Sequence, residues 1–220
     1  MGLQRYERPL LSSYKLRQTP LPDEDEGNGS NLVKRSFLIL YGLGGSGPDH
    51  WQTWLSQELL ERGETVYYPE FPGKDQPQRQ DWMETLEQVT ADIPEEEEVT
   101  VIAHSLACIL WFHYACSAPR RTMKQAILVS PVSPATDFAE VASFFPIPVN
   151  LEEVVSGAER TVFVHSSADP FCPVEDAVPY MKLGLPNLIL PNSGHINVES
   201  GHGPWPMMLE LCLRNSVILP

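Results

Sequence analysis

The 220-residue sequence lacks a long hydrophobic run and has few basic residues. No segment approaches the roughly 18 consecutive apolar residues that a membrane-spanning helix needs, so none is predicted. The N-terminus lacks the apolar core of a signal peptide, because Leu10 and Leu11 stand almost alone, and we expect a cytoplasmic protein. A formal charge of −14 argues against nucleic acid or an anionic membrane as a partner.

The sequence also lacks any spacing of cysteines and histidines that is typical of a metal site. The six histidines are scattered without paired spacing, and no Cys-x-x-Cys pair occurs, so we expect no metal. In a cytoplasmic protein, dispersed cysteines indicate buried thiols rather than disulfides. The four cysteines are Cys108, Cys116, Cys172 and Cys212.

What is present is a globular composition, with 42% hydrophobic and 20% charged residues. Residues 1–33 are interpreted as a flexible extension because residues 20–31 have the composition of an acidic linker, which leaves 34–220 as one domain. In that domain β-branched apolar runs alternate with helical segments about six times, which predicts an α/β fold with a mainly parallel sheet and helices on both faces. The predicted strands are 36–41, 65–69, 99–103, 125–130, 161–165 and 187–191. The predicted helices are 52–62, 81–91, 106–114, 174–183 (delayed or broken near Pro179) and 205–215.

Ser105 lies at the switch from the strand 99–103 to the apolar helix 106–114. Small residues, Ala103 and Ala107, stand two positions before and two after it, where the usual Gly-x-Ser-x-Gly pattern has glycines. A tight turn of this kind holds the serine backbone in a strained conformation that exposes its hydroxyl above the sheet. The pattern favours a nucleophile, although a serine at this place can also be a simple helix N-cap.

The glycine-rich loop Gly42-Leu-Gly-Gly-Ser-Gly-Pro-Asp-His-Trp51 follows the first predicted strand. It has neither a P-loop ending nor the Gly-x-Gly-x-x-Gly spacing of a dinucleotide cradle. It suits instead a backbone donor to the oxyanion of acyl transfer, with Leu43 as the first choice and Gly44 as the alternative. The second donor is the amide after the nucleophile, Leu106. Gly44 and His104 are expected beside the substrate, although the His104 side chain is expected to point away across the turn.

A serine needs a base, and the base needs an orienting acid. Asp169 and His195 each follow a predicted strand, and the order Ser105, Asp169, His195 is that of the α/β-hydrolase scaffold. Because ligands bind beyond the carboxyl ends of parallel strands, we expect all three on one rim. Asp137 is the alternative acid. Among the other histidines, His165 and His113 are expected to be structural, whereas His50 and His202 lie in loops that could line the site.

Four segments together resemble one known family, the small serine hydrolases related to retinoblastoma-binding protein 9 and bacterial YdeN. These segments are the glycine-rich loop, Ala103-His-Ser-Leu-Ala107, Asp169-Pro-Phe-Cys172 and Gly194-His-Ile-Asn-Val-Glu-Ser-Gly-His-Gly-Pro-Trp-Pro206. The resemblance covers about residues 35–214. It implies a compact α/β-hydrolase with a minimal cap, no cofactor, and a triad that falls on Ser105, Asp169 and His195. The Leu-x-Cys-x-Glu motif that binds retinoblastoma protein is absent, so that partner is not carried over.

The sequence therefore predicts a serine hydrolase that cleaves a small carboxylic ester, an amide and a thioester being the alternatives. A non-catalytic binding or scaffolding protein on the same fold remains the competing interpretation. Acyl transfer to an acceptor other than water would use the same residues. The Pro-rich segment 131–157, with several phenylalanines, is a candidate lid or pocket wall and suggests an apolar substrate group. Protein partners are not indicated by any motif.

Overall fold

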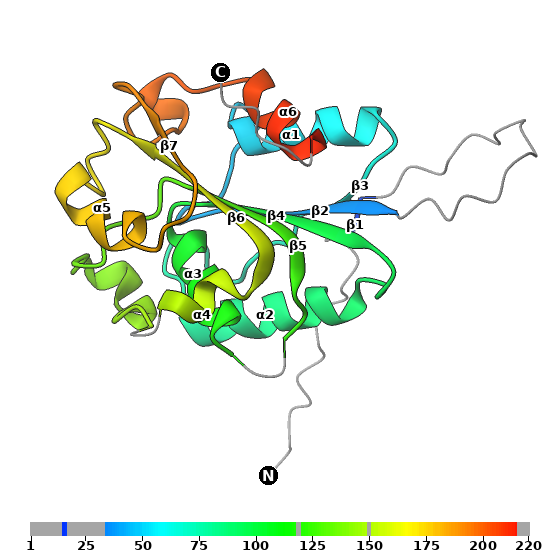
Figure 1. The fold of residues 1–220 in the computed structure, drawn as a ribbon, viewed down its shortest axis with the longest axis horizontal. Coiled ribbons are helices and arrows are strands. Elements are labelled where there is room, and N and C mark those ends of the chain that lie inside the picture. The colour runs from blue at the N-terminus through cyan, green and yellow to red at the C-terminus, as the bar shows by residue number, and fades with distance from the viewer. Residues whose placement is uncertain (1–14, 17–33, 118–119, 149–150, 215–220) are drawn as a thin grey trace, which may run out of the picture.

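The computed structural model describes residues 15–16, 34–117, 120–148 and 151–214 (Figure 1). In these residues the sheet has the strand order β1-β3-β2-β4-β5-β6-β7, with β2 to β7 parallel and β1 antiparallel at one edge. The strands are β1 (Lys15–Leu16), β2 (Arg35–Leu40), β3 (Thr65–Tyr67), β4 (Glu98–His104), β5 (Met123–Val129), β6 (Ala158–Ser166) and β7 (Asn187–Leu190). The α-helices are α1 (Trp51–Glu61), α2 (Arg79–Asp92), α3 (Leu106–Ala115), α4 (Leu151–Val155), α5 (Val174–Met181) and α6 (Pro206–Leu213), and the 3-10 helices are η1 (Ala139–Phe144) and η2 (Val198–Ser200).

Alternating side chains of the strands build two hydrophobic layers, one on each face of the sheet. In β2, Phe37 and Ile39 pack with α1 and α6, whereas Leu38 and Leu40 pack on the opposite side with α2 and α3. Figure 1 shows α1 and α6 on one side of the sheet and α2, α3 and α4 on the other. The predicted α/β fold with two covered faces is therefore confirmed.

Helix α3 occupies the centre of one layer, directly after the strand that carries Ser105. Its side chains are apolar on almost every side, and nine of its ten residues are buried. A helix of this kind is stable only inside a layer, between the sheet and other helices. The rigid packing of α3 fixes the turn that precedes it.

Helix α5 corrects one sequence-based expectation. It begins at Val174 and continues through Pro179 without a break. A proline inside a helix leaves the carbonyl four residues earlier without its donor, here that of Glu175. Glu175 is exposed, so water can bind that carbonyl, and the short helix tolerates the proline.

The two segments predicted to be irregular contain some regular structure. Residues 131–157 include η1 and α4, and in this segment Phe144 is buried whereas Phe138 is 53% exposed. In the N-terminal extension, Lys15 and Leu16 of β1 pair with Tyr67 and Val66 of β3. The predicted acidic linker at 20–31 lies outside the described residues. Among the residues that are described, no helix is both long and apolar enough to cross a lipid bilayer.

Candidate active site

Ser105 has the strained backbone that the sequence pattern predicts. Its φ of 58° and ψ of −125° are values that side-chain-bearing residues rarely adopt, and such strain concentrates at functional sites. Its amide donates a hydrogen bond to the Val129 carbonyl at 2.9 Å, which ties the turn to β5. Ala103 and Ala107 are fully buried on either side, so there is little room for larger side chains. The strain is thus held by both the neighbouring strand and the helix α3.

The glycine-rich loop passes directly over this serine. A Cβ atom placed on Gly42 would lie 2.8 Å from Ser105 Cβ and 3.1 Å from Ser105 Oγ. Real Cβ atoms do not approach that closely, so only glycine fits at position 42 while the serine keeps its place. The loop after β2 and the turn after β4 therefore form one compact unit.

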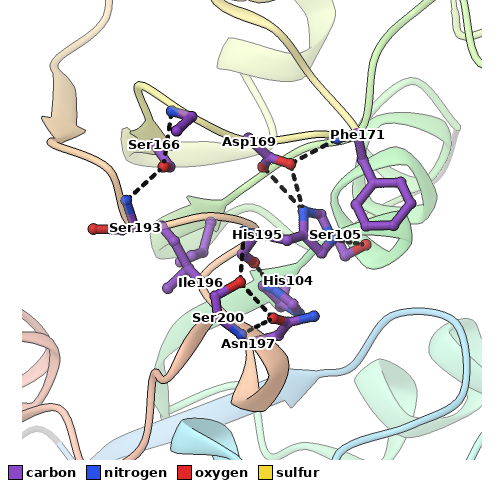
Figure 2. A network of polar contacts seen from close by, with 12 residues as sticks. His104, Ser105, Ser166, Asp169, Phe171, Ser193, His195, Ile196, Asn197 and Ser200 are labelled. Atoms are coloured by element: carbon purple, nitrogen blue, oxygen red, sulfur yellow. Dashed lines mark hydrogen bonds and ion pairs between the residues drawn. The ribbon is translucent and has the colours of Figure 1, made fainter.

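Ser105, His195 and Asp169 form a continuous hydrogen-bonded chain (Figure 2). His195 Nε2 lies 2.8 Å from Ser105 Oγ, and His195 Nδ1 lies 2.9 Å from both carboxylate oxygens of Asp169. Because a carboxylate only accepts, Nδ1 carries the ring hydrogen and Nε2 accepts from the serine hydroxyl. The structure therefore brings together the three residues that the sequence placed after β4, β6 and β7.

The Asp169 carboxylate is fixed by its own loop. The amide of Phe171 donates to Asp169 Oδ1 at 2.9 Å. Ser166 joins this loop to the histidine loop, because its hydroxyl oxygen accepts from the amides of Ala168, at 3.2 Å, and of Ser193, at 3.0 Å. Figure 2 shows the two contacts of Ser166 on the side of Asp169 away from Ser105.

The backbone of His195 is held at both its amide and its carbonyl. The amide donates to Ser200 Oγ at 3.0 Å, and the carbonyl oxygen lies 3.0 Å from His104 Nε2. Gly194 permits the first contact, because a Cβ there would come within 2.3 Å of Ser200 Oγ. Trp51 Nε1 donates to the next carbonyl, that of Ile196, at 2.8 Å. The imidazole is thus presented by a loop with little freedom to move.

His104 and His50 lie beside the three-residue chain, with ring centroids 5.1 Å (His104 to His195) and 5.2 Å (His50 to His104) apart. His104 turns its ring toward the histidine loop, as the contact with the His195 carbonyl shows, and also contributes to the cavity wall. Burial, with smaller effects of neighbouring imidazoles, lowers the pKa of His50 to about 4 and the pKa of His104 well below its usual value. Both rings are therefore neutral near pH 7.

The structure distinguishes the two predicted donors in the glycine-rich loop. The Gly44 amide donates to the Lys74 carbonyl at 2.9 Å, and Lys74 Nζ donates back to the Gly44 carbonyl at 2.8 Å. The Gly44 amide is thus already used. Leu43 and Leu106 line the cavity, and in the described part of the chain no backbone carbonyl accepts from either amide. Leu43 is therefore the better donor of the two.

A cavity of about 410 Å³ opens above Ser105. Leu43, Gly44 and His50 line it, as the sequence led us to expect. His104 lines it too, although its side chain was expected to point away across the turn; its ring centroid lies 5.1 Å from that of His195. Phe171 is a site residue that was not predicted from the sequence: its amide donates to Asp169 Oδ1, and the residue lines the cavity. An aromatic residue two positions after the acid was the signal that could have identified it.

The remaining candidates lie elsewhere. Asp137 is exposed, and His195 hydrogen-bonds to Asp169 instead. His165 Nε2 contacts Asn187 Oδ1 at 3.0 Å, and His113 Nε2 contacts the Phe144 carbonyl at 2.8 Å, which are structural roles. His202 lies in a separate shallow groove beside Trp54. Over residues 34–117, 120–148 and 151–214, no cluster of three or more acidic, histidine or cysteine residues is arranged to hold a metal ion.

Comparison with known proteins gives a consistent result. The sequence model of a family described as serine hydrolase matches residues 37–214. A hydrolase named YdeN from Bacillus subtilis is 30% identical over 76 residues, a region that spans 34% of this chain and 39% of that protein.

Solved structures resemble the fold over most of its length. The crystal structure of B. subtilis YdeN matches with a TM-score of 0.71 and 21% identity, over 83% of this chain and 98% of that one. A YdeN-like hydrolase from Pectobacterium atrosepticum matches with a TM-score of 0.64 and 19% identity, over 85% of this chain and 94% of that one. Est1E from Butyrivibrio proteoclasticus, solved with ferulic acid, matches with a TM-score of 0.58 and 15% identity, over 82% of this chain and 86% of that one. At these identities the likeness shows the α/β-hydrolase fold.

Proposed function

The chain belongs to the serine hydrolase family, and we propose that it hydrolyses a carboxylic ester, with Ser105, His195 and Asp169 as its catalytic triad. The observation that carries this proposal is the unbroken hydrogen-bonded chain from Ser105 Oγ through His195 to the Asp169 carboxylate. Spacings of 2.8 and 2.9 Å are those that proton transfer requires. The similar structures include an esterase domain and a thioesterase domain, which supports hydrolysis at an acyl carbonyl.

The mechanism follows from the positions of the hydrogens. His195 Nε2 accepts the Ser105 proton as the hydroxyl oxygen attacks the carbonyl carbon. Asp169 stabilises the resulting imidazolium and keeps its ring in the required tautomer. His195 then protonates the leaving alcohol, and a water molecule, activated in the same way, releases the acid and regenerates Ser105.

The negative charge of the tetrahedral intermediate needs donors that are already in place. The Leu106 amide at the start of α3 and the Leu43 amide are assigned this role. Both residues line the cavity above Ser105. The N-terminus of α3 adds a favourable electrostatic field for an anion there.

A purely binding role on the same fold is less well supported. That interpretation would be favoured if the side chains of Ser105, His195 and Asp169 were too far apart to hydrogen-bond, or if Ser105 did not reach the cavity. Here the three side chains are in contact, and Ser105 lines the cavity. A strained backbone at Ser105 also has no evident purpose in a protein that only binds.

Replacing the acid tests the proposal against its closest alternative. We expect Asp169→Asn to lower kcat for 4-nitrophenyl acetate by about 10⁴-fold, because an amide no longer selects the reactive tautomer of His195. Asp137→Asn is the matched control and should retain wild-type kcat, since Asp137 is exposed and the acid position is occupied by Asp169. The opposite pattern, with Asp137→Asn inactive and Asp169→Asn active, would refute the assignment of the acid.

A substitution in the glycine-rich loop tests the position of the oxyanion donors. The Cβ of Gly42→Ala would clash with Ser105 Cβ, which moves either the loop or the serine. We expect kcat to fall by about 10²-fold, the usual effect of losing one donor, together with about 1–3 kcal/mol of stability from overpacking. Gly47→Ala in the same loop is the control, because a Cβ there meets no atom within 4 Å. Equal kinetics and melting temperatures for the two variants would contradict this account.

A further inference from the structure

Two phenylalanines from different segments meet at the mouth of the cavity. Phe138 precedes η1, and Phe171 follows β6; their ring centroids are 6.3 Å apart in an edge-to-face arrangement. Both are unusually exposed for large apolar side chains, at 53% and 40%. Exposed aromatic groups that line a cavity gain stabilisation when a ligand covers them.

Phe171 places this aromatic pair next to the reacting atoms. Its ring centroid lies 4.6 Å from that of His195, and its amide holds Asp169. Figure 2 shows the Phe171 ring and Ser105 on the same side of the imidazole. A group that packs on Phe171 is therefore within a few bonds of a carbonyl attacked by Ser105.

Two buried valines add apolar surface to the cavity. Val132 and Val141 line the same cavity and are buried, at 8% and 4% exposure. The volume of about 410 Å³ lies within the range of about 300–1,000 Å³ that is typical of sites for small organic ligands. The cavity therefore has room for a ring and a short linker in addition to the ester.

The charges around the cavity disfavour an anionic substrate. Of the described residues that line it, Glu199 is the only Asp, Glu, Lys or Arg. Burial keeps His50 and His104 neutral near pH 7, so neither supplies a positive charge. A carboxylate on the substrate would face Glu199 with no Lys or Arg among the lining residues, on a chain with a formal charge of −14. Lys74, whose Nζ donates to the Gly44 carbonyl, is half exposed and lies 3.4 Å from Asp75 Oδ1, so its charge is already compensated by Asp75 and by solvent.

We propose that this cavity selects esters whose acyl group carries an uncharged aryl ring, packed against Phe138 and Phe171, and rejects acyl groups that bear a carboxylate. This inference rests on the proposed function. The ring is assigned to the acyl group rather than to the leaving alcohol, because the acyl group stays bonded to Ser105 through both half-reactions. Contacts of Phe138 and Phe171 with the acyl group therefore act on both steps.

The aryl preference is measured by pH-stat with esters that differ only in the ring. We expect kcat/KM for methyl 3-phenylpropanoate to exceed that for methyl 3-cyclohexylpropanoate by about 3- to 10-fold, the effect of an aromatic pair beyond buried area. Phe171→Leu and Phe138→Leu keep the apolar bulk and should each reduce this ratio toward one. Ile189→Leu, at an exposed apolar side chain that does not line the cavity, should leave the ratio unchanged.

The charge preference is measured with dimethyl succinate and monomethyl succinate. Wild type should favour the uncharged diester by at least about 10-fold, and Glu199→Lys should narrow this ratio several-fold. The inference would be overturned by equal rates for the aryl and cyclohexyl esters. It would also be overturned if the ring preference appeared only when the ring is on the alcohol side, in benzyl acetate against cyclohexylmethyl acetate. The charge preference would be refuted if Glu199→Lys left the ratio of diester to monoester rates unchanged. Failure of the proposed function is distinguishable, because wild type would then hydrolyse none of these esters, whereas failure of this inference leaves hydrolysis intact and unselective.

Discussion

The Ser105→Ala variant should lose about 10⁶-fold in kcat for 4-nitrophenyl acetate, close to the effect of removing the whole triad, because no other hydroxyl takes over the attack. The fold should survive. Alanine keeps the Cβ and loses only the hydrogen bond to His195, which contributes about 1 kcal/mol. Activity is measured by steady-state kinetics and stability by thermal unfolding.

A companion variant separates chemistry from backbone strain. Ser105→Gly should be equally inactive but more stable than Ser105→Ala by about 1–2 kcal/mol, because glycine adopts a φ of 58° and a ψ of −125° without steric cost. Turnover within 10-fold of wild type in either variant would show that Ser105 is not the nucleophile. Equal stability of the two variants would show that the turn is not strained.

Removing the base should be equally severe for activity and more costly for stability. His195→Ala should lower kcat by about 10⁶-fold, since Ser105 then has no group to take its proton. It also leaves the buried Asp169 carboxylate with the Phe171 amide but without the imidazole, which should cost about 1–3 kcal/mol.

His202→Ala is the matched control for this variant. His202 lies in a different groove, packed edge-on against Trp205 at 4.7 Å between ring centroids. Its replacement should leave kcat within about threefold of wild type. Wild-type turnover by His195→Ala, or an equal loss in His202→Ala, would mean that the base has been wrongly assigned.

The layered fold could be predicted because its signals are local. Short β-branched runs separated by helical segments indicate parallel strands, and alternation within β2 sends Phe37 and Ile39 to one layer and Leu38 and Leu40 to the other. The order of the strands in the sheet could not be predicted, because β2 lies between β3 and β4 through pairings that connect distant parts of the chain. Pro179 misled the prediction, since the effect of a proline depends on whether the freed carbonyl reaches water.

The meeting of Ser105, Asp169 and His195 on one rim was predictable for a similar reason. Each follows a strand, and parallel strands bring their carboxyl ends to one rim. The supporting contacts were not predictable, because they join segments that the sequence does not relate. Leu43 is preferred to Gly44 as the oxyanion donor because the Gly44 amide bonds to Lys74 in another loop. The backbone of His195 is fixed by hydrogen bonds with His104 and Ser200.

The measurement that tests the central claim most directly is labelling by a fluorophosphonate probe, which reacts covalently with activated serines. Intact mass and peptide mapping should show wild type modified once, at Ser105, and Ser105→Ala unmodified. His195→Ala, which keeps the serine but lacks its base, should react at least about 10³-fold more slowly. Labelling of Ser105→Ala at the wild-type rate, or no labelling of folded wild type, would contradict the account.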